Sequence, residues 1–333
     1  MKKLTRTVLA VLGLCLVFCA PAFAEDQVYN LKLQTYYSPT TISHLENLAK
    51  SVDIASNGQI KIQLYTGGEL VASANMLKGV QGGMIDMAQG CGAYYTELAI
   101  GPIEGGMPMA WMSPLEAQII YDEMGLGKLV AEQYAKFDVV WLGTMWAAPY
   151  QILSKEPIKS LDDLRKMKIR AIGASAKMFQ NLGVSTVNMP PEDIYLALST
   201  GQIGAVLYGA AYEYQLNKYY EVAPYFVESP VLNPFVDSII INKKVWDSMP
   251  ANLQEILKNA VEMSRFAWYI HCEYLGAEAR AKIFKEVTTL PAEDQAAMTK
   301  AAVTAWDEEG AKSPENAKAV EIIKEFAKRV GRI

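Results

Sequence analysis

The chain has 333 residues, of which 51% are hydrophobic and 20% are charged, and its formal net charge is -5. This length fits two domains of ordinary size, and the hydrophobic content excludes a wholly disordered chain. The acidic charge argues against nucleic-acid binding, which needs a basic surface. His44 and His271 are the only histidines, which leaves little room for histidine-based catalysis or for a metal site with several histidine ligands.

Residues 1–24 have the features of a secretory signal peptide. A basic start is followed by an apolar segment over residues 8–19 and by Ala22-Phe23-Ala24, with small residues where signal peptidase requires them. The apolar segment is too short to span a bilayer core of roughly 30 Å. We therefore expect export to the periplasm with cleavage after Ala24, which removes three basic residues and leaves a formal charge of -8.

The next part of the chain alternates between strand and helix patterns. Residues 31–34 and 60–64 alternate between apolar and polar side chains, so both are predicted strands. Between them, apolar residues from Leu45 to Val52 recur at helical spacing, and Gly58 follows where a helix would end. This order predicts two parallel strands joined by a right-handed crossover.

A similar alternation begins again at Val139. Residues 168–171 and 205–207 are predicted strands, and between them a helix begins near Pro190 and ends at Gly201. The predicted fold class is therefore α/β, with two sheets.

A long helix is predicted from Ala251 to about Val287. Apolar residues recur at helical spacing after Pro250, and the segment contains no proline and one glycine, Gly276. A helix of this length exceeds one small domain and can run along two. Because no Ser/Gly/Pro-rich linker separates the domains, we expect the chain to cross between them more than once and to form a hinge.

The common catalytic motifs are absent from the sequence. It has no G-x-S-x-G elbow, no P-loop and no H-E-x-x-H segment. His271 is next to Cys272, but neighbouring helix residues point about 100° apart, so this pair does not form a nucleophile and base. We expect both histidines to be surface or packing residues. For Cys91 and Cys272, free buried thiols are favoured over a disulfide, which export would allow.

Arg170 is the most informative single residue. It lies near the carboxyl end of the predicted strand over residues 168–171. In open α/β sheets ligands bind outside the carboxyl ends of the strands, and a guanidinium there can bind a carboxylate through two parallel hydrogen bonds. From the local pattern alone, an arginine on an exposed strand face is the alternative.

Aromatic residues gather near the ends of the predicted strands. Such clustering suits a cleft that packs rings against a ligand. With 18 tyrosines in the chain, some of these residues are also expected to pack in the core or at an interface. The candidate ligand contacts besides Arg170 are Tyr37, Tyr94, Trp146, Tyr150, Tyr208 and Phe235.

Five segments, in order along the chain, match the pattern of one protein family. Residues 158–170 read IKSLDDLRKMKIR, and the further segments cover residues 64–70, 83–88, 197–203 and 241–250. The first resembles the pattern P-I-x-x-x-x-D-L-x-G-x-K-I-R of TRAP (tripartite ATP-independent periplasmic) transporter solute-binding proteins, the DctP-type family. Together the matches span nearly the whole chain after the signal peptide.

The resemblance implies a two-lobed periplasmic-binding-protein fold with a long helix that spans both lobes. Lobe I is expected to comprise residues 25–149 and about 236–275, and lobe II residues of about 150–235 and 276–333. The resemblance also implies a binding protein rather than an enzyme. It would clamp the carboxylate of an organic acid with Arg170 and deliver the acid to the membrane subunits of a TRAP transporter, as a monomer or a homodimer and without a cofactor.

The chain departs from the family pattern at two places. Many relatives read G-x-x-D-G-x-E-N where residues 201–208 here read GQIGAVLY, so Leu207 replaces the acid with which several 2-oxo-acid binders hold a metal ion. No metal site is therefore expected. Dicarboxylate and sialic-acid binders often carry a second arginine shortly before the P-I element, and residues 147–152 contain none. One arginine among aromatic residues favours a monocarboxylate with an apolar or aromatic body.

Two other classes of function stay open on the sequence. A ligand-sensing protein of the same fold would present a carboxylate or a sugar acid to a membrane receptor. An exported hydrolase would need a nucleophile and a base, which the scarcity of histidine disfavours.

Overall fold

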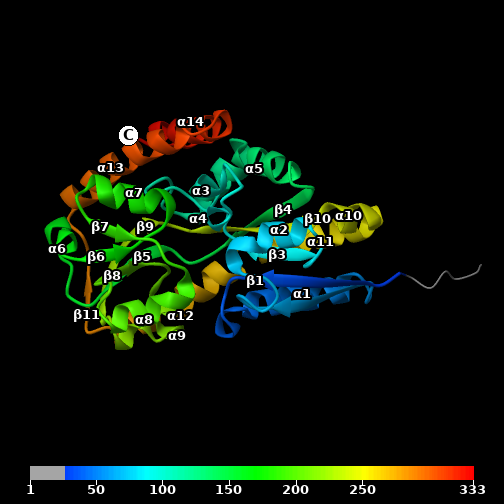
Figure 1. Cartoon of the computed structure of the whole chain (residues 1–333), viewed down its shortest axis with the longest axis horizontal. Coiled ribbons are helices and arrows are strands. Elements are labelled where there is room, and N and C mark those ends of the chain that lie inside the picture. Colours follow the sequence, from blue (N-terminus) through cyan, green and yellow to red (C-terminus); the bar gives the residue numbers. More distant parts are fainter. Residues whose placement is uncertain (1–26) are drawn as a thin grey trace, which may run out of the picture.

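The computed structural model describes residues 27–333 as an α/β protein with two sheets (Figure 1). The predicted fold class and the predicted pair of sheets are therefore confirmed. The signal peptide predicted over residues 1–24 lies outside the described residues. Across residues 27–333, none of the helices combines the length and the apolar character that crossing a bilayer requires.

The first sheet has five strands in the order β2-β1-β3-β10-β4. They are β1 (Tyr29–Thr35), β2 (Ile60–Tyr65), β3 (Met87–Gly90), β4 (Val139–Trp146) and β10 (Val236–Asn242). β1 is parallel to β2 and β3, whereas β10 is antiparallel to β3 and β4. The predicted parallel pairing of β1 with β2, through α1 (Ser43–Ala55), is confirmed. As a result, the carboxyl ends of β1 and β3 share one edge of the sheet with the amino end of β10.

The second sheet has six strands in the order β11-β9-β5-β8-β6-β7. They are β5 (Tyr150–Ser154), β6 (Lys168–Arg170), β7 (Ser185–Val187), β8 (Ala205–Leu207), β9 (Tyr225–Leu232) and β11 (Glu286–Thr288). β6 is parallel to both β7 and β8, and β5 is antiparallel to β8 and β9. The carboxyl ends of β6 and β8, two of the predicted strands, therefore lie side by side.

Helices surround both sheets. Besides α1, they are α2 (Met76–Gln81), α3 (Gly101–Glu104), α4 (Pro114–Gln118), α5 (Leu126–Ala135), α6 (Leu161–Arg165), α7 (Gly173–Asn181), α8 (Ile194–Ser199), α9 (Ala211–Leu216), α10 (Lys243–Ser248), α11 (Ala251–Ser264), α12 (Ala267–Lys282), α13 (Ala292–Gly310) and α14 (Pro314–Arg329). α1 and α11 pack on the first sheet, where Leu33, Leu48 and Leu257 are fully buried in one cluster. Burying a leucine side chain stabilises a fold by about 1.5–3 kcal/mol, so this cluster anchors the first helix and the long helix to the sheet.

The long helix predicted from Ala251 is present but bent, and it ends earlier than expected. It is divided into α11 and α12 at Arg265 and Phe266, and Val287 lies in strand β11 instead. At the bend the backbone N–H of Trp146 donates a hydrogen bond of 2.9 Å to the Arg265 carbonyl, which draws that carbonyl toward β4. Beyond α12 the Lys285 N–H bonds to the Pro224 carbonyl, which takes the chain into the second sheet. A periodic pattern cannot reveal either of these tertiary contacts.

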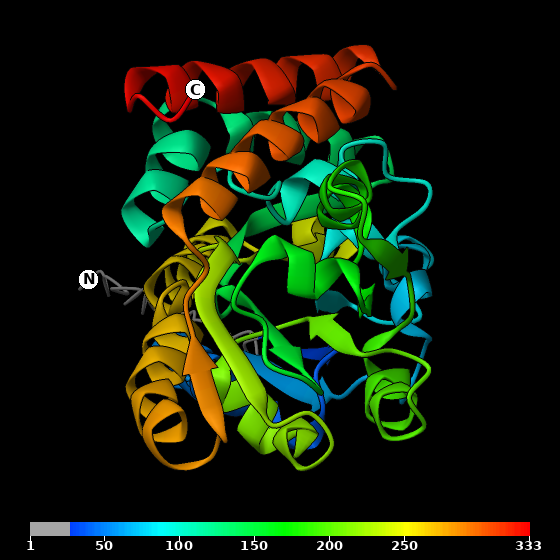
Figure 2. The same cartoon turned by 90° about the vertical axis from the view of Figure 1, so that its left-hand side faces the viewer.

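The last two helices, orange to red in Figures 1 and 2, lie together along the top of the molecule in both views. α13 packs against α7, and α14 packs against α5. The Trp306 indole N–H, on α13, donates a hydrogen bond of 2.9 Å to the Pro108 carbonyl, and Glu315 forms an ion pair with Lys136. The C-terminal helices therefore bond to residues that precede β4 and also pack against α7, which follows β6 of the second sheet.

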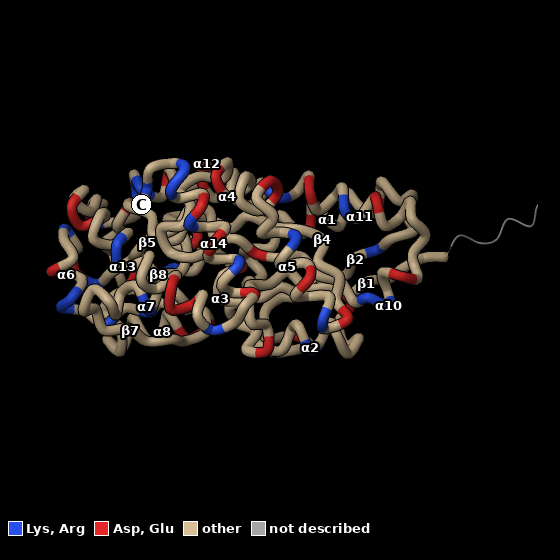
Figure 3. The backbone as a smooth tube through the Cα atoms, turned by 90° about the horizontal axis from the view of Figure 1, so that it is seen from above, with Lys and Arg blue, Asp and Glu red and all other residues tan. Residues whose placement is uncertain are grey.

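Charged residues of both signs are intermixed along the backbone (Figure 3). Most ion pairs of the described residues join exposed side chains, as Lys243 and Asp247 do on α10. Such exposed pairs contribute only about 0–1 kcal/mol each. The burial of apolar side chains therefore dominates the stability of the fold.

Candidate functional site

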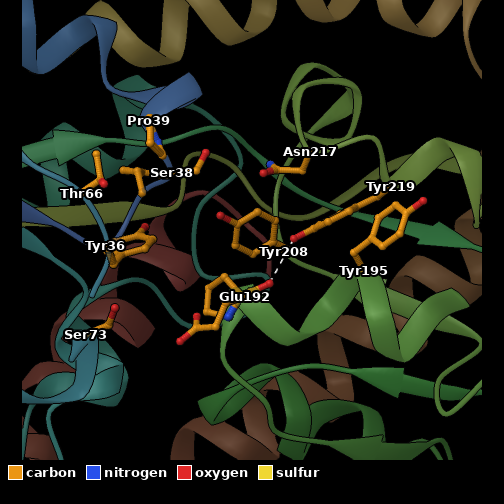
Figure 4. A pocket seen from close by; sticks show the side chains of 13 residues that line it. Tyr36, Ser38, Pro39, Thr66, Ser73, Glu192, Tyr195, Tyr208, Asn217 and Tyr219 are labelled. Atoms are coloured by element: carbon orange, nitrogen blue, oxygen red, sulfur yellow. Dashed lines mark hydrogen bonds between the residues drawn. The ribbon is translucent and has the colours of Figure 1, made fainter. Parts of the chain in front are cut away.

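A cleft of about 410 Å³ opens between the two sheets (Figure 4). One wall comes from the segments that follow β1 and β2, and the other comes from the segments around α8, β8 and α9. The lining residues are Tyr36, Tyr37, Ser38, Pro39, Thr66, Gly67, Ser73, Pro191, Glu192, Tyr195, Tyr208, Asn217 and Tyr219. The two walls thus combine the carboxyl ends of parallel strands from both sheets, where ligands bind in open α/β folds.

Arg170 ends β6 and is fully buried behind this cleft. Its Nε and one terminal nitrogen donate hydrogen bonds of 3.1 and 3.0 Å to the Met189 carbonyl, and the other terminal nitrogen donates one of 3.0 Å to the Leu207 carbonyl. Among residues 27–333, none of the arginine ion pairs involves Arg170. A buried guanidinium held by neutral acceptors keeps its full positive charge, and burying such a charge is costly unless an anion balances it.

Aromatic rings connect Arg170 to the cleft. The Tyr208 ring, which lines the cleft, has its centroid 5.8 Å from the Arg170 guanidinium carbon. The Tyr94 hydroxyl accepts a hydrogen bond of 3.4 Å from Arg170, and the Tyr94 ring lies 5.7 Å from that of Tyr36. Tyr36 in turn stacks on Tyr37 at 4.4 Å. The structure therefore brings Tyr37, Tyr94 and Tyr208 together with Arg170 in one continuous cluster.

Tyr150 and Phe235 stack on each other next to this cluster. Their ring centroids are 4.3 Å apart and their planes differ by 4°. Burial raises the pKa of the Tyr150 hydroxyl well above its usual range. The Tyr94 hydroxyl raises this pKa further and the positive charge of Arg170 lowers it, so the Tyr150 hydroxyl lies within electrostatic range of both. Both rings are buried, and neither lines the cleft of about 410 Å³.

Trp146 packs at the bend of the long helix. Its ring meets Phe266 edge-on at 4.2 Å, and the Arg265 guanidinium carbon lies 5.7 Å from its centroid. Trp146, the last residue of β4, is fully buried, and these contacts place its side chain against the junction of α11 and α12. The geometry therefore associates Trp146 with the long helix rather than with the cluster around Arg170.

Asp237, on β10, is a buried acid behind the cleft that sequence reasoning missed. Its carboxylate accepts hydrogen bonds from the hydroxyls of Tyr36 (2.9 Å) and Tyr37 (3.1 Å) and from the Gln89 amide (3.2 Å). Burial raises the pKa of Asp237 to about 7, although these three donors lower it in part. The available signal was a single acid inside the apolar segment of residues 235–241, an unusual position for a carboxylate.

Two further carboxyl groups are buried near the two sheets. Glu104, on α3, accepts a hydrogen bond of 2.8 Å from the Tyr134 hydroxyl, and Glu213, on α9, accepts one of 3.1 Å from the Ala210 N–H. Burial raises the pKa of each carboxyl to about 7. Burial therefore favours the neutral form of both groups.

The two histidines and the two cysteines are packing residues. His44 is buried, its Nε2 lies 3.1 Å from the Gln89 side-chain oxygen, and burial lowers its pKa to about 4. His271 stacks on Trp268 at 5.7 Å. Cys91 and Cys272 are buried and free, as predicted.

Comparison with known proteins identifies the family. Residues 35–313 match the family described as bacterial extracellular solute-binding protein, family 7 (DctP). The chain is 28% identical over 271 residues to a monocarboxylate 2-oxoacid-binding periplasmic protein of Nostoc sp. (strain PCC 7120), which covers 79% of this chain and 72% of the relative.

Solved structures share the fold. A TRAP periplasmic solute-binding protein from Chromohalobacter salexigens, with bound (S)-(+)-2-amino-1-propanol, has a TM-score of 0.82 and 24% identity and covers 92% of this chain and 97% of its own. One from Colwellia psychrerythraea, with bound calcium and pyruvate, has a TM-score of 0.83 and 19% identity and covers 92% and 96%. On the match over residues 35–313, this chain belongs to the DctP family of bacterial extracellular solute-binding proteins, the solute-binding proteins of TRAP transporters.

Proposed function

We propose that this protein captures a monocarboxylate with an apolar or aromatic body in the periplasm and delivers it to the membrane subunits of a TRAP transporter. The observation that carries the proposal is the buried guanidinium of Arg170, which has no acidic partner among the described residues and lies behind an aromatic cleft. A ligand carboxylate would supply the missing negative charge. The name of the Nostoc relative, which describes a monocarboxylate binder, supports the same class of ligand.

We propose that binding closes two lobes around the ligand, with lobe I formed by residues 25–149 and about 236–275 and lobe II by residues of about 150–235 and 276–333. The strands support this division, because β1 to β4 and β10 form one sheet and the other six strands form the second. Closure would be a shift between open and closed populations that the ligand favours. The contacts of α14 with α5 would have to persist or slide during this motion.

The proposed site binds the carboxylate without a metal ion. Leu207 offers only its carbonyl oxygen, which already accepts a hydrogen bond from Arg170. Within residues 27–333, His, Cys, Asp and Glu side chains form no group of three or more that could hold a metal. The Colwellia structure, by contrast, contains bound calcium and pyruvate. We also propose that the protein binds without catalysis, in keeping with its family.

The test is a thermal-shift screen of the mature protein against organic acids. The panel contains short 2-oxo acids, branched-chain and aromatic monocarboxylates, C4-dicarboxylates and sugar acids, each with and without EDTA. A ligand at 100 times its Kd adds about 2.7 kcal/mol, which gives a clear rise in Tm. We expect EDTA-insensitive shifts from monocarboxylates. Larger shifts from dicarboxylates, or shifts that EDTA removes, would contradict the single-arginine, metal-free site.

Delivery is tested separately from binding. Proteoliposomes that carry the TRAP membrane subunits of the same genome should take up the acid identified by the screen only when the binding protein is added. Uptake that is equal without the protein would favour the alternative in which it presents its ligand to a membrane receptor.

A further inference from the structure

The two parts of the long helix expose different kinds of residue. On α11 the exposed residues are mostly polar and include Asn252, Glu255, Lys258, Asn259 and Glu262. On α12 they are mostly apolar and include Ala267, Ile270, Tyr274, Ala277 and Ala281. Ile270 is 60% exposed and Tyr274 is 76% exposed. In Figure 2 the long helix, yellow to orange, forms the lower left edge of the molecule, so this apolar face points outward.

α12 is apolar on its opposite face as well. Trp268, Cys272 and Ala279 are buried there against the rest of the protein. At 100° per residue, Ile270 and Ala281 lie roughly 160–180° around the helix from Cys272. A helix at the surface of a globular protein normally carries polar residues on its outer face, and a helix that is apolar all round is normally buried. The outer face of α12 therefore has the composition of a surface that another element covers.

The exposed apolar residues follow the spacing of a coiled-coil seam. Over residues 267–281 they recur at steps of three and four, which is the 3.5-residue period of the a and d positions. Glu273 and Arg280 flank this seam on one side, and His271 and Glu278 flank it on the other. Such a seam packs against a second helix, and the flanking charges select the partner and its direction.

We propose that α12 pairs in antiparallel orientation with α12 of a second copy of this chain. The two-fold axis would pass between Leu275 and Gly276, so that residues 269–282 of both copies overlap. This inference goes beyond the proposed function, because it concerns residues that do not line the cleft.

Side-chain sizes in this arrangement are complementary. Ile270 faces Ala281 of the partner subunit, and Tyr274 faces Ala277 of the partner subunit. Two-fold symmetry repeats both pairs, so every large side chain of the overlap meets an alanine. Alternation of large and small residues across facing positions lets two helices interdigitate closely.

The flanking charges favour the antiparallel orientation. Glu273 then faces Arg280 of the partner subunit, and Glu278 faces His271 of the partner subunit. Within the described chain Arg280 pairs with Glu228 through its Nε at 3.5 Å, which leaves its terminal nitrogens to donate to the glutamate. A parallel pair would instead bring Glu273 next to Glu278 of the partner subunit, and like charges disfavour that orientation.

The size of the contact makes the dimer reversible. The overlapping segments are about 21 Å long at 1.5 Å per residue. A single helix pair of this length buries less surface than the roughly 1,200–2,000 Å² of a stable interface. We therefore expect association at micromolar or higher protein concentration, with folded monomers below it.

Sedimentation equilibrium of the mature protein measures this association. From about 1 μM to about 1 mM, the range of weak affinities, the wild type should pass from monomer to dimer. Ile270→Glu puts a charge into the seam and should raise the Kd of the dimer at least ~tenfold. Asn259→Glu introduces the same residue at an exposed position of α11 and should leave the Kd unchanged.

Charge reversal tests the orientation. Glu273→Arg should weaken the dimer, because it places two cations opposite each other. Adding Arg280→Glu to that variant restores opposite charges in the antiparallel pair and should recover the affinity. A double variant that associates no more tightly than Glu273→Arg would overturn the antiparallel arrangement.

Two further results would overturn the inference. A wild-type protein that stays monomeric up to about 1 mM would exclude a second copy and leave the seam to a helix of another protein. A dimer that Ile270→Glu leaves as tight as the wild type would place the interface on another surface. Neither result depends on ligand binding, so failure of this inference and failure of the proposed function are distinguishable.

Discussion

Tyr150 and Phe235 stack face to face at the two places where the extended chain crosses between the sheets. Tyr150 begins β5 immediately after the crossing from β4, and Phe235 precedes β10 on the way back. Backbone hydrogen bonds connect the same crossings, from the Ala147 N–H to the Phe235 carbonyl (2.9 Å) and from the Phe235 N–H to the Ala148 carbonyl (3.2 Å). The stacked pair therefore holds the two crossing segments against each other. A hinge between the two sheets would have to bend at these segments.

Replacing either ring should destabilise the protein in a coupled way. Tyr150→Leu and Phe235→Leu are each expected to lower the free energy of unfolding by about 1–3 kcal/mol, because each changes the shape of a packed, buried side chain. The double variant should lose less free energy of unfolding than the two single variants together. The difference should be the ~0.5–1.5 kcal/mol that a stacked aromatic pair contributes beyond its buried area. Urea denaturation of the four proteins measures this coupling, and strictly additive losses would show that the stacking adds nothing.

The ligand-free protein should lose stability as the pH rises from about 5 to 8. The carboxyls of Glu104, Glu213 and Asp237 have a pKa of about 7 in the folded protein, against about 4 when unfolded. Between these values the folded state binds protons that the unfolded state has released, so stability is highest near the unfolded pKa and is lost as the pH rises through 7. His44 has a folded pKa of about 4, so its contribution to stability rises with pH over this range. The three carboxyls outnumber this single histidine, so the net stability should still fall.

Melting by circular dichroism at several pH values tests this dependence. The Tm at pH 5.5 should exceed that at pH 8 by about 5 °C or more, which corresponds to roughly 2 kcal/mol for a protein of this size. Glu104→Gln keeps an acceptor for the Tyr134 hydroxyl and removes one titrating carboxyl, so it should flatten the dependence. A Tm that rises from pH 5.5 to pH 8 would contradict the assignment of raised pKa values.

The two thiols of the mature chain should be unreactive in the native state. Cys91 and Cys272 are fully buried, and burial raises the pKa of each thiol well above its usual range. Because the thiolate is the reactive form, neither should react with Ellman's reagent at pH 8 within minutes. Unfolding in guanidinium chloride should expose two thiols per chain. No reactive thiol after unfolding would indicate a disulfide, and rapid labelling of the native protein would contradict their burial.

The strands β1, β2, β6 and β8 and the position of Arg170 could be predicted because they depend on local patterns. The period-two alternation of β1 and β2 follows from one buried face each, and Arg170 could be placed at a strand end from residues 168–171 alone. The helix between the first two strands was equally visible in its apolar spacing. These features depend on residues within about ten positions of one another.

The contacts of Asp237 and the bend in the long helix could not be predicted in the same way. Asp237 meets Tyr36 and Tyr37, which are about 200 positions away, and local periodicity carries no information on such a pairing. The bend at Arg265 depends on a hydrogen bond from Trp146, on another strand. For the same reason the sequence could not distinguish aromatic residues that line the cleft, such as Tyr208, from those that pack elsewhere, such as Trp146.

The most direct test of the carboxylate site is the affinity of Arg170→Gln for the tightest acid of the thermal-shift screen, measured by isothermal titration. Arg165→Gln is the matched control, because Arg165 lies five positions earlier, is exposed and forms an ion pair with Asp162. Two charge-assisted hydrogen bonds contribute about 3 kcal/mol or more, so Arg170→Gln should weaken binding at least ~100-fold. Arg165→Gln should bind like the wild type, and both variants should melt cooperatively. An Arg170→Gln protein that binds within about threefold of the wild-type affinity, a difference of under ~1 kcal/mol, would contradict the assignment of Arg170 as the carboxylate ligand.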